Sequence, residues 1–412
     1  MLQKTARLYL DAYTGLSREV WYLSVVLLIN RTGAMVLPFL TVYLTTQRAY
    51  SLAAAGFVMS CFGAGSLVGS YLGGWLTDRL GFYPVQQWTL VVSGFLFWWV
   101  GQQTELWATA ISIFVLSMIA DAFRPANNAA LAYYSRPENR ARAYGLLRLA
   151  ANLGFSTGPV LGGLLIASLG YEMLFWVDGA TCLLAAIAFR VLLPPGRDEQ
   201  HPDASVAVVR GLSAYRNGPF LAFAIFNTLV AIGFMQFFSS LPVYLKQHLG
   251  FTEGQIGGLI AINGVLIVLT EMPLVHQLSL RFRPLMLIAT GNALIGLAYL
   301  LLLGAAGPLI FSVGFILLLT IGEMISMPFT STFAAAVAPE PRRGEYMGLL
   351  GISWSAAFII APSLGLRWAA LFGFAALWQL VALLGLVGAV GMLLLYWWEK
   401  QKAHLPGNIR QE

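Results

Sequence analysis

The sequence predicts an all-α integral membrane protein with twelve transmembrane helices in two pseudo-symmetric six-helix bundles. Of its 412 residues, 58% are hydrophobic and only 10% are charged, which is far from the composition of a soluble domain. Apolar runs of about 18 residues or more, each able to cross roughly 30 Å of hydrocarbon, follow one another along the chain. Residues of the first half also recur in the second half at a constant spacing, which predicts the two-bundle architecture.

The predicted spans come in a regular order from the first residues to the last. They cover residues 20–45, 52–76, 85–103, 107–134, 143–168, 174–193, 219–245, 254–278, 284–304, 308–333, 344–366 and 370–398. The first run is too long for the apolar core of a signal peptide, so we expect it to anchor the protein. Cys61 and Cys182 both fall inside spans, which disfavours a disulfide framework, and with four scattered histidines we expect no metal site.

A polar segment divides the chain into the two predicted bundles. Residues 1–193 form the N-terminal bundle, 194–218 a cytoplasmic linker, and 219–412 the C-terminal bundle with a short cytoplasmic tail. At an offset of 203, the first-half residues Pro125, Gly145, Leu146, Leu147, Pro159, Leu161 and Gly162 match Pro328, Gly348, Leu349, Leu350, Pro362, Leu364 and Gly365. Two homologous halves are typical of transporters that alternate access around a site at their interface.

The basic residues predict the orientation of the spans. If the N-terminus is cytoplasmic, eighteen of the 24 Lys and Arg residues face the cytoplasm. Three face outward (Arg48, Lys246 and Arg367), and three lie within the membrane (Arg31, Arg124 and Arg148). Because cytoplasmic loops carry the excess of Lys and Arg, both termini are predicted to be cytoplasmic. The net charge of +6 then follows from topology, and we expect no nucleic-acid partner.

Three motifs carry a resemblance to a known family. The stretch GGWLTDRLGFYP (73–84) resembles the loop signature between helices 2 and 3 of the major facilitator superfamily, with Phe82 and Tyr83 in place of a basic pair. The stretch GFSTGPVLGG (154–163) resembles the helix 5 signature of its drug/proton antiporter branch. Residues 322–348 resemble helix 10 and the following loop of multidrug transporters. The resemblance covers the whole chain and implies the major facilitator fold.

The resemblance also implies roles for the matching residues. The loop residues Gly74, Asp78, Arg79 and Gly81 correspond to a gate whose Asp stabilises the outward-open form. The helix 5 residues Gly154, Gly158, Pro159, Gly162 and Gly163 allow close helix packing and a bend. One departure concerns helix 4, where the antiporter branch usually carries an arginine upstream of its proline. This chain has Ile113 there, so that coupling arginine is not carried over.

Polar side chains inside the spans mark the candidate substrate cavity. Asp121, Arg124 and Asn128 share one face of a helix, and a charge at mid-bilayer costs about 2.5 to 3.5 kcal/mol, so this stripe must face protein or water. In the implied fold, helices 1, 4, 7 and 10 line the cavity, which gives the candidates Asn30, Arg31, Arg124, Asn128, Asn227, Gln236 and Met327. The alternative is that Asp121 and Arg124 form a structural ion pair.

Three carboxylic acids are candidates for proton coupling. Glu323 has no Lys or Arg within a turn or two in sequence, and burial favours the neutral form of such a group. At the offset of 203 it corresponds to Ala120, next to Asp121, the second candidate. Glu271 is the third, with packing at the inner gate as its alternative. A permanently protonated structural role is the alternative for Glu323.

Three further ionisable residues inside the spans receive structural interpretations. We expect Arg148 to reach the cytoplasmic interface and Asp178 to have a hydrated or capping role. His276 is expected to be an interfacial group.

The predicted function is secondary active transport rather than enzymatic catalysis. The sequence has no phosphate-binding Gly-Lys loop, nucleophile elbow or metal-ligand spacing, which points to an ion gradient as energy source and to no cofactor. The expectation is proton-coupled export of amphiphilic or cationic small molecules by alternating access, by a monomer in a bacterial inner membrane whose partners are substrate, protons and lipids. The alternatives are a dedicated carrier for one metabolite, siderophore or sugar, and a non-transporting sensor or lipid-handling protein.

Overall fold

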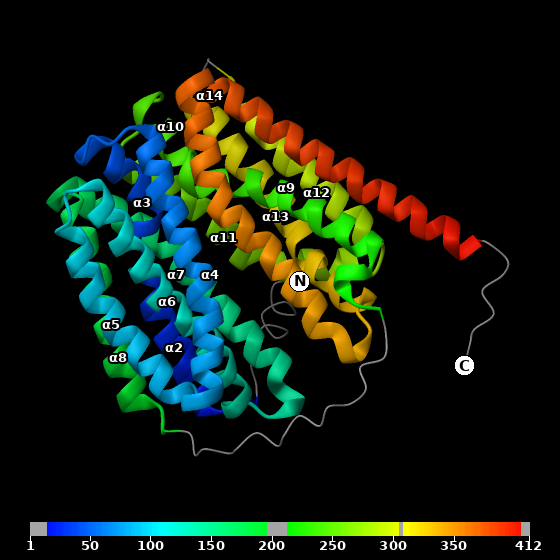
Figure 1. Ribbon diagram of the computed structural model, residues 1–412, viewed down its shortest axis with the longest axis horizontal. Coiled ribbons are helices and arrows are strands. Elements are labelled where there is room, and N and C mark those ends of the chain that lie inside the picture. The colour runs from blue at the N-terminus through cyan, green and yellow to red at the C-terminus, as the bar shows by residue number, and fades with distance from the viewer. Residues whose placement is uncertain (1–14, 196–211, 305–307, 405–412) are drawn as a thin grey trace, which may run out of the picture. The chain divides into compact units, whose positions relative to one another are not determined.

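The computed structural model describes residues 15–195, 212–304 and 308–404, and all the regular secondary structure in these ranges is helical (Figure 1). The helices of the first half are α2 (Arg18–Thr32), α3 (Val36–Val42), α4 (Leu52–Leu80), α5 (Phe82–Gly101), α6 (Leu106–Tyr134), α7 (Arg140–Leu169) and α8 (Glu172–Leu192). Those of the second half are α9 (Gly218–Ser239), α10 (Leu241–Gln247), α11 (Glu253–Ser279), α12 (Pro284–Leu301), α13 (Pro308–Val337) and α14 (Arg343–His404). A π-helical turn (Tyr43–Gln47) extends α3. Most of the predicted linker, residues 196–211, lies outside the described residues.

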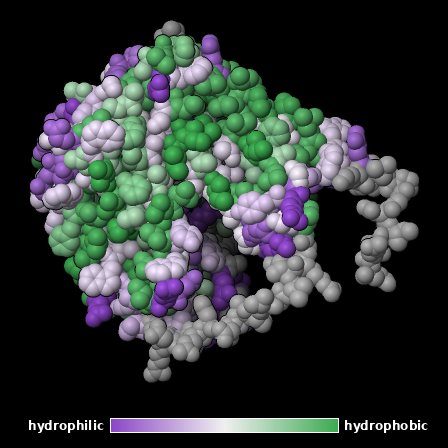
Figure 2. Space-filling view, viewed as in Figure 1, coloured by the Kyte–Doolittle hydropathy of each residue, from purple (hydrophilic) through white to green (hydrophobic). Residues whose placement is uncertain are grey.

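Ten helical stretches of the described chain are long and apolar enough to cross a membrane. One of them lies in α14, whose 62 residues would extend about 93 Å if straight, three times the thickness of a bilayer core. Gly373, with φ of +84°, interrupts α14. Apolar side chains also cover most of the helical surface visible in Figure 2. These features confirm a multi-span helical membrane protein, whereas the count of twelve helices stays a prediction.

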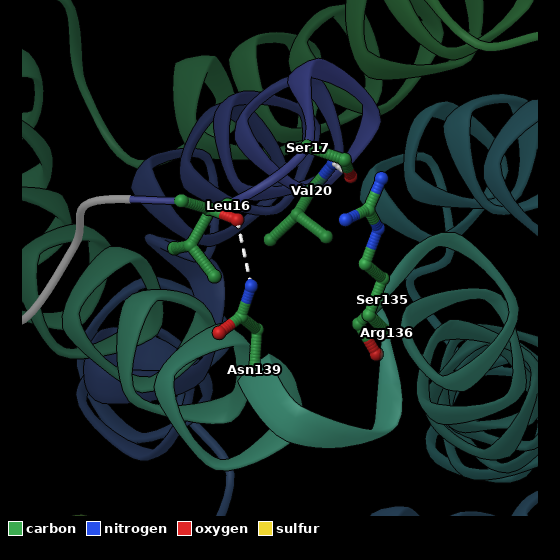
Figure 3. A pocket seen from close by; sticks show the side chains of 7 residues that line it. Leu16, Ser17, Val20, Ser135, Arg136 and Asn139 are labelled. Carbon is green, nitrogen blue, oxygen red and sulfur yellow. Dashed lines mark hydrogen bonds between the residues drawn. The ribbon is translucent and has the colours of Figure 1, made fainter.

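Local sequence explains where several helices begin and end. The Ser51 hydroxyl caps α4 by accepting the Ala54 N–H at 3.2 Å. Gly81, with φ of +81°, is the single residue between α4 and α5. At the start of α2, the Ser17 hydroxyl accepts the Val20 N–H and donates to the Tyr134 carbonyl oxygen at 2.8 Å. Ser17 and Val20 line a small cavity of about 250 Å³ with Arg136 at these helix ends (Figure 3).

The helices form two contact units that do not follow the halves of the sequence. The first unit comprises residues 1–202, 238–268 and 362–367, and the second comprises 203–237, 269–361 and 368–412. The first unit therefore contains α10, most of α11 and a short piece of α14 besides the first-half helices. The domain boundaries drawn from the sequence stay predictions.

Within the first unit, α4 and α6 pack backbone to backbone. A Cβ added at Gly65, Gly69 or Gly73 would lie 2.0 to 2.5 Å from main-chain atoms of α6. These three glycines are spaced four residues apart, so they form one stripe along α4. Small residues are the usual means by which membrane helices approach closely.

The second unit shows the same kind of helix contact between α12 and α13. A Cβ at Gly291 would lie 2.5 Å from the Gly322 carbonyl oxygen, and one at Gly322 would lie 2.8 Å from that of Gly291. Beside this contact, Phe220, Phe223 and Tyr346 are buried in an aromatic cluster. Glu323, the residue after Gly322, is therefore carried on a helix that is closely packed on one side.

Candidate functional site

The first membrane-spanning segment is broken beside the candidate site. The predicted span 20–45 consists of α2, which ends at Thr32, and α3, which begins at Val36. Asp178 of α8 is 1% exposed, and its carboxylate accepts the N–H of Met35 at 3.1 Å and that of Val36 at 2.9 Å. A buried carboxylate thus satisfies main-chain donors at the start of α3. The capping interpretation of Asp178 is confirmed.

Close helix contacts hold this break in place. A Cβ at Gly33 would lie 1.8 Å from the Thr181 hydroxyl oxygen, so α8 presses directly on the break. A Cβ at Gly154 of α7 would lie 2.4 Å from the Cβ of Arg31. Arg31 stands in the last turn of α2, and its backbone therefore has little room to shift relative to α7.

A cavity of about 310 Å³ opens next to Arg31 within the first unit. Its polar lining comes from Arg31, Arg124, Asn127, Asn128 and Arg148. Leu27, Phe123, Leu147 and Phe155 supply apolar lining, together with Tyr144. We refer to this space as the arginine cavity. It lies between α2, α6 and α7, which are membrane-spanning segments by length and composition.

The three guanidinium groups of the arginine cavity have different surroundings. Arg124 donates to Asp121 at 3.1 Å, and its side chain is 60% exposed whereas that of Asp121 is 12% exposed. Arg31 lies over the Phe155 ring, 5.4 Å from its centroid, and pairs with no carboxylate in the described part of the chain. Arg148 is exposed and lines the cavity, and its predicted reach to the cytoplasmic interface stays a prediction.

The predicted polar stripe on α6 is only partly free to meet a substrate. Arg124 and Asn128 line the cavity, and Asp121 is joined to it through Arg124. Asn127, which the sequence did not single out, accepts a hydrogen bond from Gln86 at 3.0 Å. Asn30 donates to the Cys182 sulfur at 3.6 Å, away from the residues that line the cavity.

The residues of the predicted gate lie where α4 ends. Asp78 is exposed, and its side chain forms no hydrogen bond or ion pair with any described residue. The Arg79 guanidinium lies 4.2 Å from the centroid of the Trp75 ring. A Cβ at Gly74 would meet no atom within 4 Å, so Gly74 makes no close helix contact, and Gly81 adopts the positive φ given above. The gating role of these four residues stays a prediction.

The helix 5 signature places small residues on two sides of α7. Gly154, Gly158 and Gly162 face α2 and α3, where a Cβ at each would lie between 2.4 and 3.2 Å from Arg31, Thr32 or Met35. On another side, a Cβ at Gly163 would lie 2.5 Å from the Glu253 carbonyl oxygen, and one at Gly257 would lie 2.2 Å from that of Pro159. These contacts agree with the expectation of close packing around this signature.

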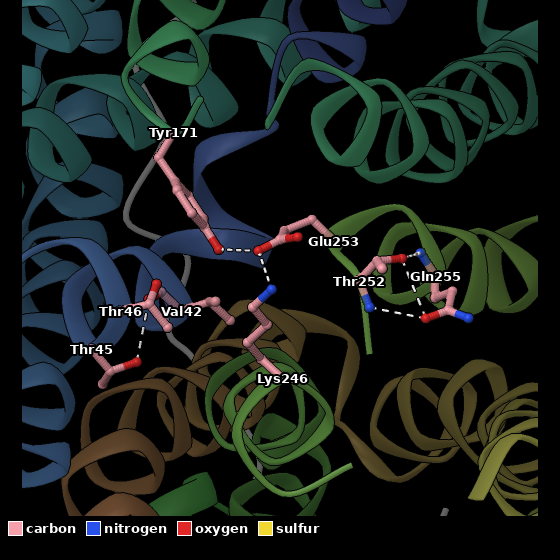
Figure 4. Close-up of polar contacts among 8 residues, drawn as sticks. All are labelled: Val42, Thr45, Thr46, Tyr171, Lys246, Thr252, Glu253 and Gln255. Carbon is pink, nitrogen blue, oxygen red and sulfur yellow. Dashed lines mark hydrogen bonds and ion pairs between the residues drawn. The ribbon is translucent and has the colours of Figure 1, made fainter. Parts of the chain in front are cut away.

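A polar network connects the two halves of the sequence within the first unit. The Tyr171 hydroxyl donates to Glu253 at 2.6 Å, and Lys246 pairs with the same carboxylate oxygen at 2.7 Å (Figure 4). Burial raises the pKa of the Tyr171 phenol well above its ordinary value, so it stays a proton donor. We call these three residues the outer contact, because the predicted topology places Lys246 outside. No sequence pattern predicts this contact, because Tyr171 and Glu253 are 82 residues apart.

The remaining candidates lie on α9, α11 and α13 of the second unit. Glu271 is buried and Glu323 is half-buried. Thr270 contacts the Met324 sulfur at 3.3 Å, so α11 and α13 lie side by side next to both acids. Gln236 is engaged with the Ala361 carbonyl oxygen at 2.8 Å. The Asn227 amide nitrogen is buried without a hydrogen-bond partner among the described residues, and Met327 is half-buried.

Comparisons with known proteins place this geometry in a family. The family model described as Major Facilitator Superfamily matches residues 23–340. The chain is 28% identical over 351 residues to the multidrug resistance protein MdtH of Cronobacter sakazakii, covering 82% of this chain and 84% of that protein. It is 23% identical over 411 residues to a Na(+), Li(+), K(+)/H(+) antiporter of Planococcus maritimus, covering 92% and 95%.

A solved structure gives the same result for the fold. The crystal structure of a POT family transporter in complex with 5-aminolevulinic acid superposes with a TM-score of 0.74 at 16% identity, covering 93% of this chain and 96% of that one. At this identity the likeness concerns the fold alone. The family model, however, matches well over half of the chain. The chain therefore belongs to the Major Facilitator Superfamily of membrane transporters.

Proposed function

We propose that this transporter exports amphiphilic small molecules from the cytoplasm in exchange for protons. The observation that carries the proposal is the arginine cavity, which places Arg31 and the Asp121–Arg124 pair inside membrane-spanning helices. Charges at membrane depth are costly, and for that reason they usually mark the path of a substrate or ion. The apolar lining of the same cavity suits the hydrophobic body of an amphiphile.

The outer contact supports alternating access, because its polar interactions are of a kind that can break and reform. The outer contact adds one hydrogen bond and one ion pair, both partly accessible to solvent, to the close helix packing at Gly163 and Gly257. Such polar contacts contribute little net free energy, so a substrate or proton is able to shift the balance between two states. On the predicted cytoplasmic side, we assign the corresponding role to Gly74, Asp78, Arg79 and Gly81.

Proton coupling is assigned to Glu323, with Asp121 and Glu271 as the other candidates. Glu323 is half-buried and is the one carboxylic acid on α13. The names of the two relatives, a multidrug resistance protein and a cation/proton antiporter, support export as the direction and the proton as the coupling ion.

Transport by purified protein in liposomes tests the function. With an imposed pH gradient, an amphiphilic dye should accumulate against its own gradient in the compartment from which protons leave. A protonophore should abolish that accumulation, and adding dye should move protons. Protein-free liposomes serve as the control. A dye flux that does not depend on the pH gradient would contradict proton coupling. The absence of counterflow would favour a non-transporting sensor.

Cysteine labelling tests the proposed orientation. A cysteine introduced at position 205 should resist a membrane-impermeant thiol reagent in intact cells, whereas one at position 48 should react. Labelling at 205 from outside would overturn the assignment of cytoplasmic termini. The native Cys61 and Cys182 are replaced by serine in this background.

A further inference from the structure

Asn127 of α6 is a buried polar side chain that lines the arginine cavity. It is 5% exposed, and its side-chain oxygen accepts the hydrogen bond from Gln86. Its amide nitrogen has no hydrogen-bond partner among the described residues, and it is not enclosed by protein atoms. Buried carboxamides normally have partners for their donors. Asn127 therefore has N–H groups available for a molecule inside the cavity.

Gln86 of α5 fixes the direction of this amide. Gln86 is fully buried, and its amide nitrogen donates to the Asn127 oxygen at 3.0 Å. The side-chain oxygen of Gln86 is buried without a hydrogen-bond partner in the described part of the chain. An unsatisfied buried acceptor is costly, and an apolar side chain would avoid that cost. Packing alone gives no reason for Gln86 at this place, whereas holding the Asn127 oxygen against α5 directs the nitrogen away from α5.

The neighbouring arginines favour the same kind of ligand group. A guanidinium donates hydrogen bonds and cannot accept them. Arg31 lies over the Phe155 ring in the cavity lining, and Arg124 uses part of its donor capacity on Asp121. A carbonyl oxygen on an apolar body matches both the donors and the apolar walls. A hydrocarbon of the same shape would leave the donors unsatisfied, and a site of this kind discriminates against such a ligand.

We propose that Asn127 donates a hydrogen bond to a carbonyl oxygen of the transported amphiphile, and that Gln86 is the residue that positions it. This inference rests on the proposed transport function and narrows its substrate class to amphiphiles whose apolar body carries a carbonyl group. Because the donor is a neutral amide, this contact sets no requirement for the net charge of the substrate.

Two ligands of the same shape test the proposal. Acetylnaphthalene and isopropenylnaphthalene differ only in that a methylene group replaces the carbonyl oxygen. Their affinities are measured by titration calorimetry with purified protein in a neutral detergent, and the heat of transfer into protein-free micelles is subtracted. We expect the ketone to bind about fivefold to tenfold more tightly, which is the usual contribution of one hydrogen bond. Equal affinities, or tighter binding of the hydrocarbon, would overturn the proposal.

The carbonyl stretching band of the bound ketone reports the hydrogen bond directly. Infrared difference spectra between isotope-labelled and unlabelled ketone separate this band from the amide bands of the protein. A hydrogen bond weakens the C=O bond, so the band should lie at lower frequency in the wild-type protein than in an Asn127→Leu variant. The same frequency in both proteins would contradict Asn127 as the donor.

Substitutions assign the preference to the two residues. Asn127→Leu should abolish the preference for the ketone while leaving the affinity for the hydrocarbon within about twofold. Gln86→Leu should reduce the preference about threefold, because the Asn127 amide is then free to turn. Gln86→Glu should restore part of it, since a protonated carboxyl group can donate to Asn127. Gln102→Leu is the matched control, as Gln102 is exposed beyond the end of α5 and does not line the cavity.

The hydrocarbon separates recognition from a structural role. If the bond between Gln86 and Asn127 only holds α5 to α6, the variants should weaken both ligands alike. A ketone preference that survives in Asn127→Leu would place the donor elsewhere and overturn the proposal. Should Asn127→Leu bind neither ligand, Asn127→Ala takes its place with the same expected result.

The outcomes also separate this inference from the proposed function, because binding is measured without flux. Ketone binding that depends on Asn127, without proton-coupled flux in liposomes, would support the site and contradict the function. Proton-coupled flux together with equal affinities for the two ligands would support the function and contradict the site.

Discussion

Arginines gather around one cavity in the first half of this transporter, whereas two membrane-spanning helices of the second half carry acids and no basic Lys or Arg. The first half places Arg31, Arg124 and Arg148 around one cavity, whereas α11 and α13 of the second half contain Glu271 and Glu323 and no Lys or Arg. The halves nevertheless share prolines, glycines and leucines at a fixed offset. The repeat thus preserves positions that shape helices, while the charges differ. This difference favours separate tasks, with substrate recognition in one half and proton transfer in the other.

Neutralising Glu323 should have the largest effect, in this case on transport driven by a pH gradient. Glu323→Gln keeps the volume of the side chain but cannot exchange a proton. We expect it to abolish uphill transport driven by a pH gradient, while substrate exchange down its own gradient continues. Flux and counterflow in liposomes measure the two activities separately.

Glu271→Gln provides the comparison within the second half. If the Glu323 variant still concentrates substrate at the wild-type rate, the coupling group is elsewhere, and Glu271 or Asp121 takes its place. Loss of coupling in the Glu271 variant alone would identify Glu271. Loss of coupling in an Asp121→Asn variant alone would place proton transfer in the first half, and would contradict the assignment of substrate recognition and proton transfer to different halves.

Removing the carboxylate that caps the broken first helix should have the second largest effect, in this case on the stability of the protein. Asp178→Ala leaves the N–H groups of Met35 and Val36 without their acceptor in a buried place. The expected loss is about 3 kcal/mol of folding free energy, since each buried unsatisfied donor costs about 1 to 3 kcal/mol. The temperature at which half of the purified protein survives heating should fall by several degrees. Glu172→Ala, an exposed acid on the same helix, is the control and should change it little.

Breaking the outer contact should shift the conformational balance by a smaller amount. Glu253→Gln removes the ion pair with Lys246, and a partly buried pair contributes about 1 kcal/mol, which corresponds to about fivefold in population. Spin labels at positions 47 and 247, which are both exposed, should then report more of a longer distance. Tyr171→Phe loses one hydrogen bond and should act in the same direction but less. An unchanged distance distribution in both variants would exclude a gating role for this contact.

Asp78→Asn should shift the conformational balance least, and in the direction opposite to the shift caused by Glu253→Gln. Asp78 is exposed and unpaired within the described residues, so its removal should not alter stability. The gate interpretation expects it to slow transport about twofold by weakening the outward-open form, with little change in substrate affinity. Adding Asp78→Asn to Glu253→Gln should return the label distances toward wild type. Loss of substrate binding with normal distances would contradict the gate.

The helices were largely predictable, because long apolar runs determine them. The span predicted at 107–134 is α6, Leu106–Tyr134, and the small residues predicted to allow close packing on α7 do face α2, α3 and α11. The break in the first helix was not predictable. Local sequence offers Gly33, but the capping carboxylate belongs to Asp178, far along the chain.

The site was predictable in its residue types and less so in its arrangement. The stripe of Arg124 and Asn128 does line a cavity with Arg31. Arg148 joins it because Gly154 brings α7 against α2, a contact between distant segments that no local pattern shows. The outer contact was missed for the same reason, since Tyr171 lies 82 residues before Glu253 and no local pattern joins them.

The cap on the broken helix imposes an order on the biosynthesis of the protein. Asp178 follows Val36 by 142 residues, and translation at about 5 to 20 residues per second needs roughly 7 to 28 s to reach it. Until α8 enters the membrane, the N–H groups of Met35 and Val36 have no carboxylate to receive them. The first span is therefore synthesised before the carboxylate that caps its break, and the cap can form only after the sixth span arrives. A truncated chain that ends before Asp178 lacks the group that sets this geometry.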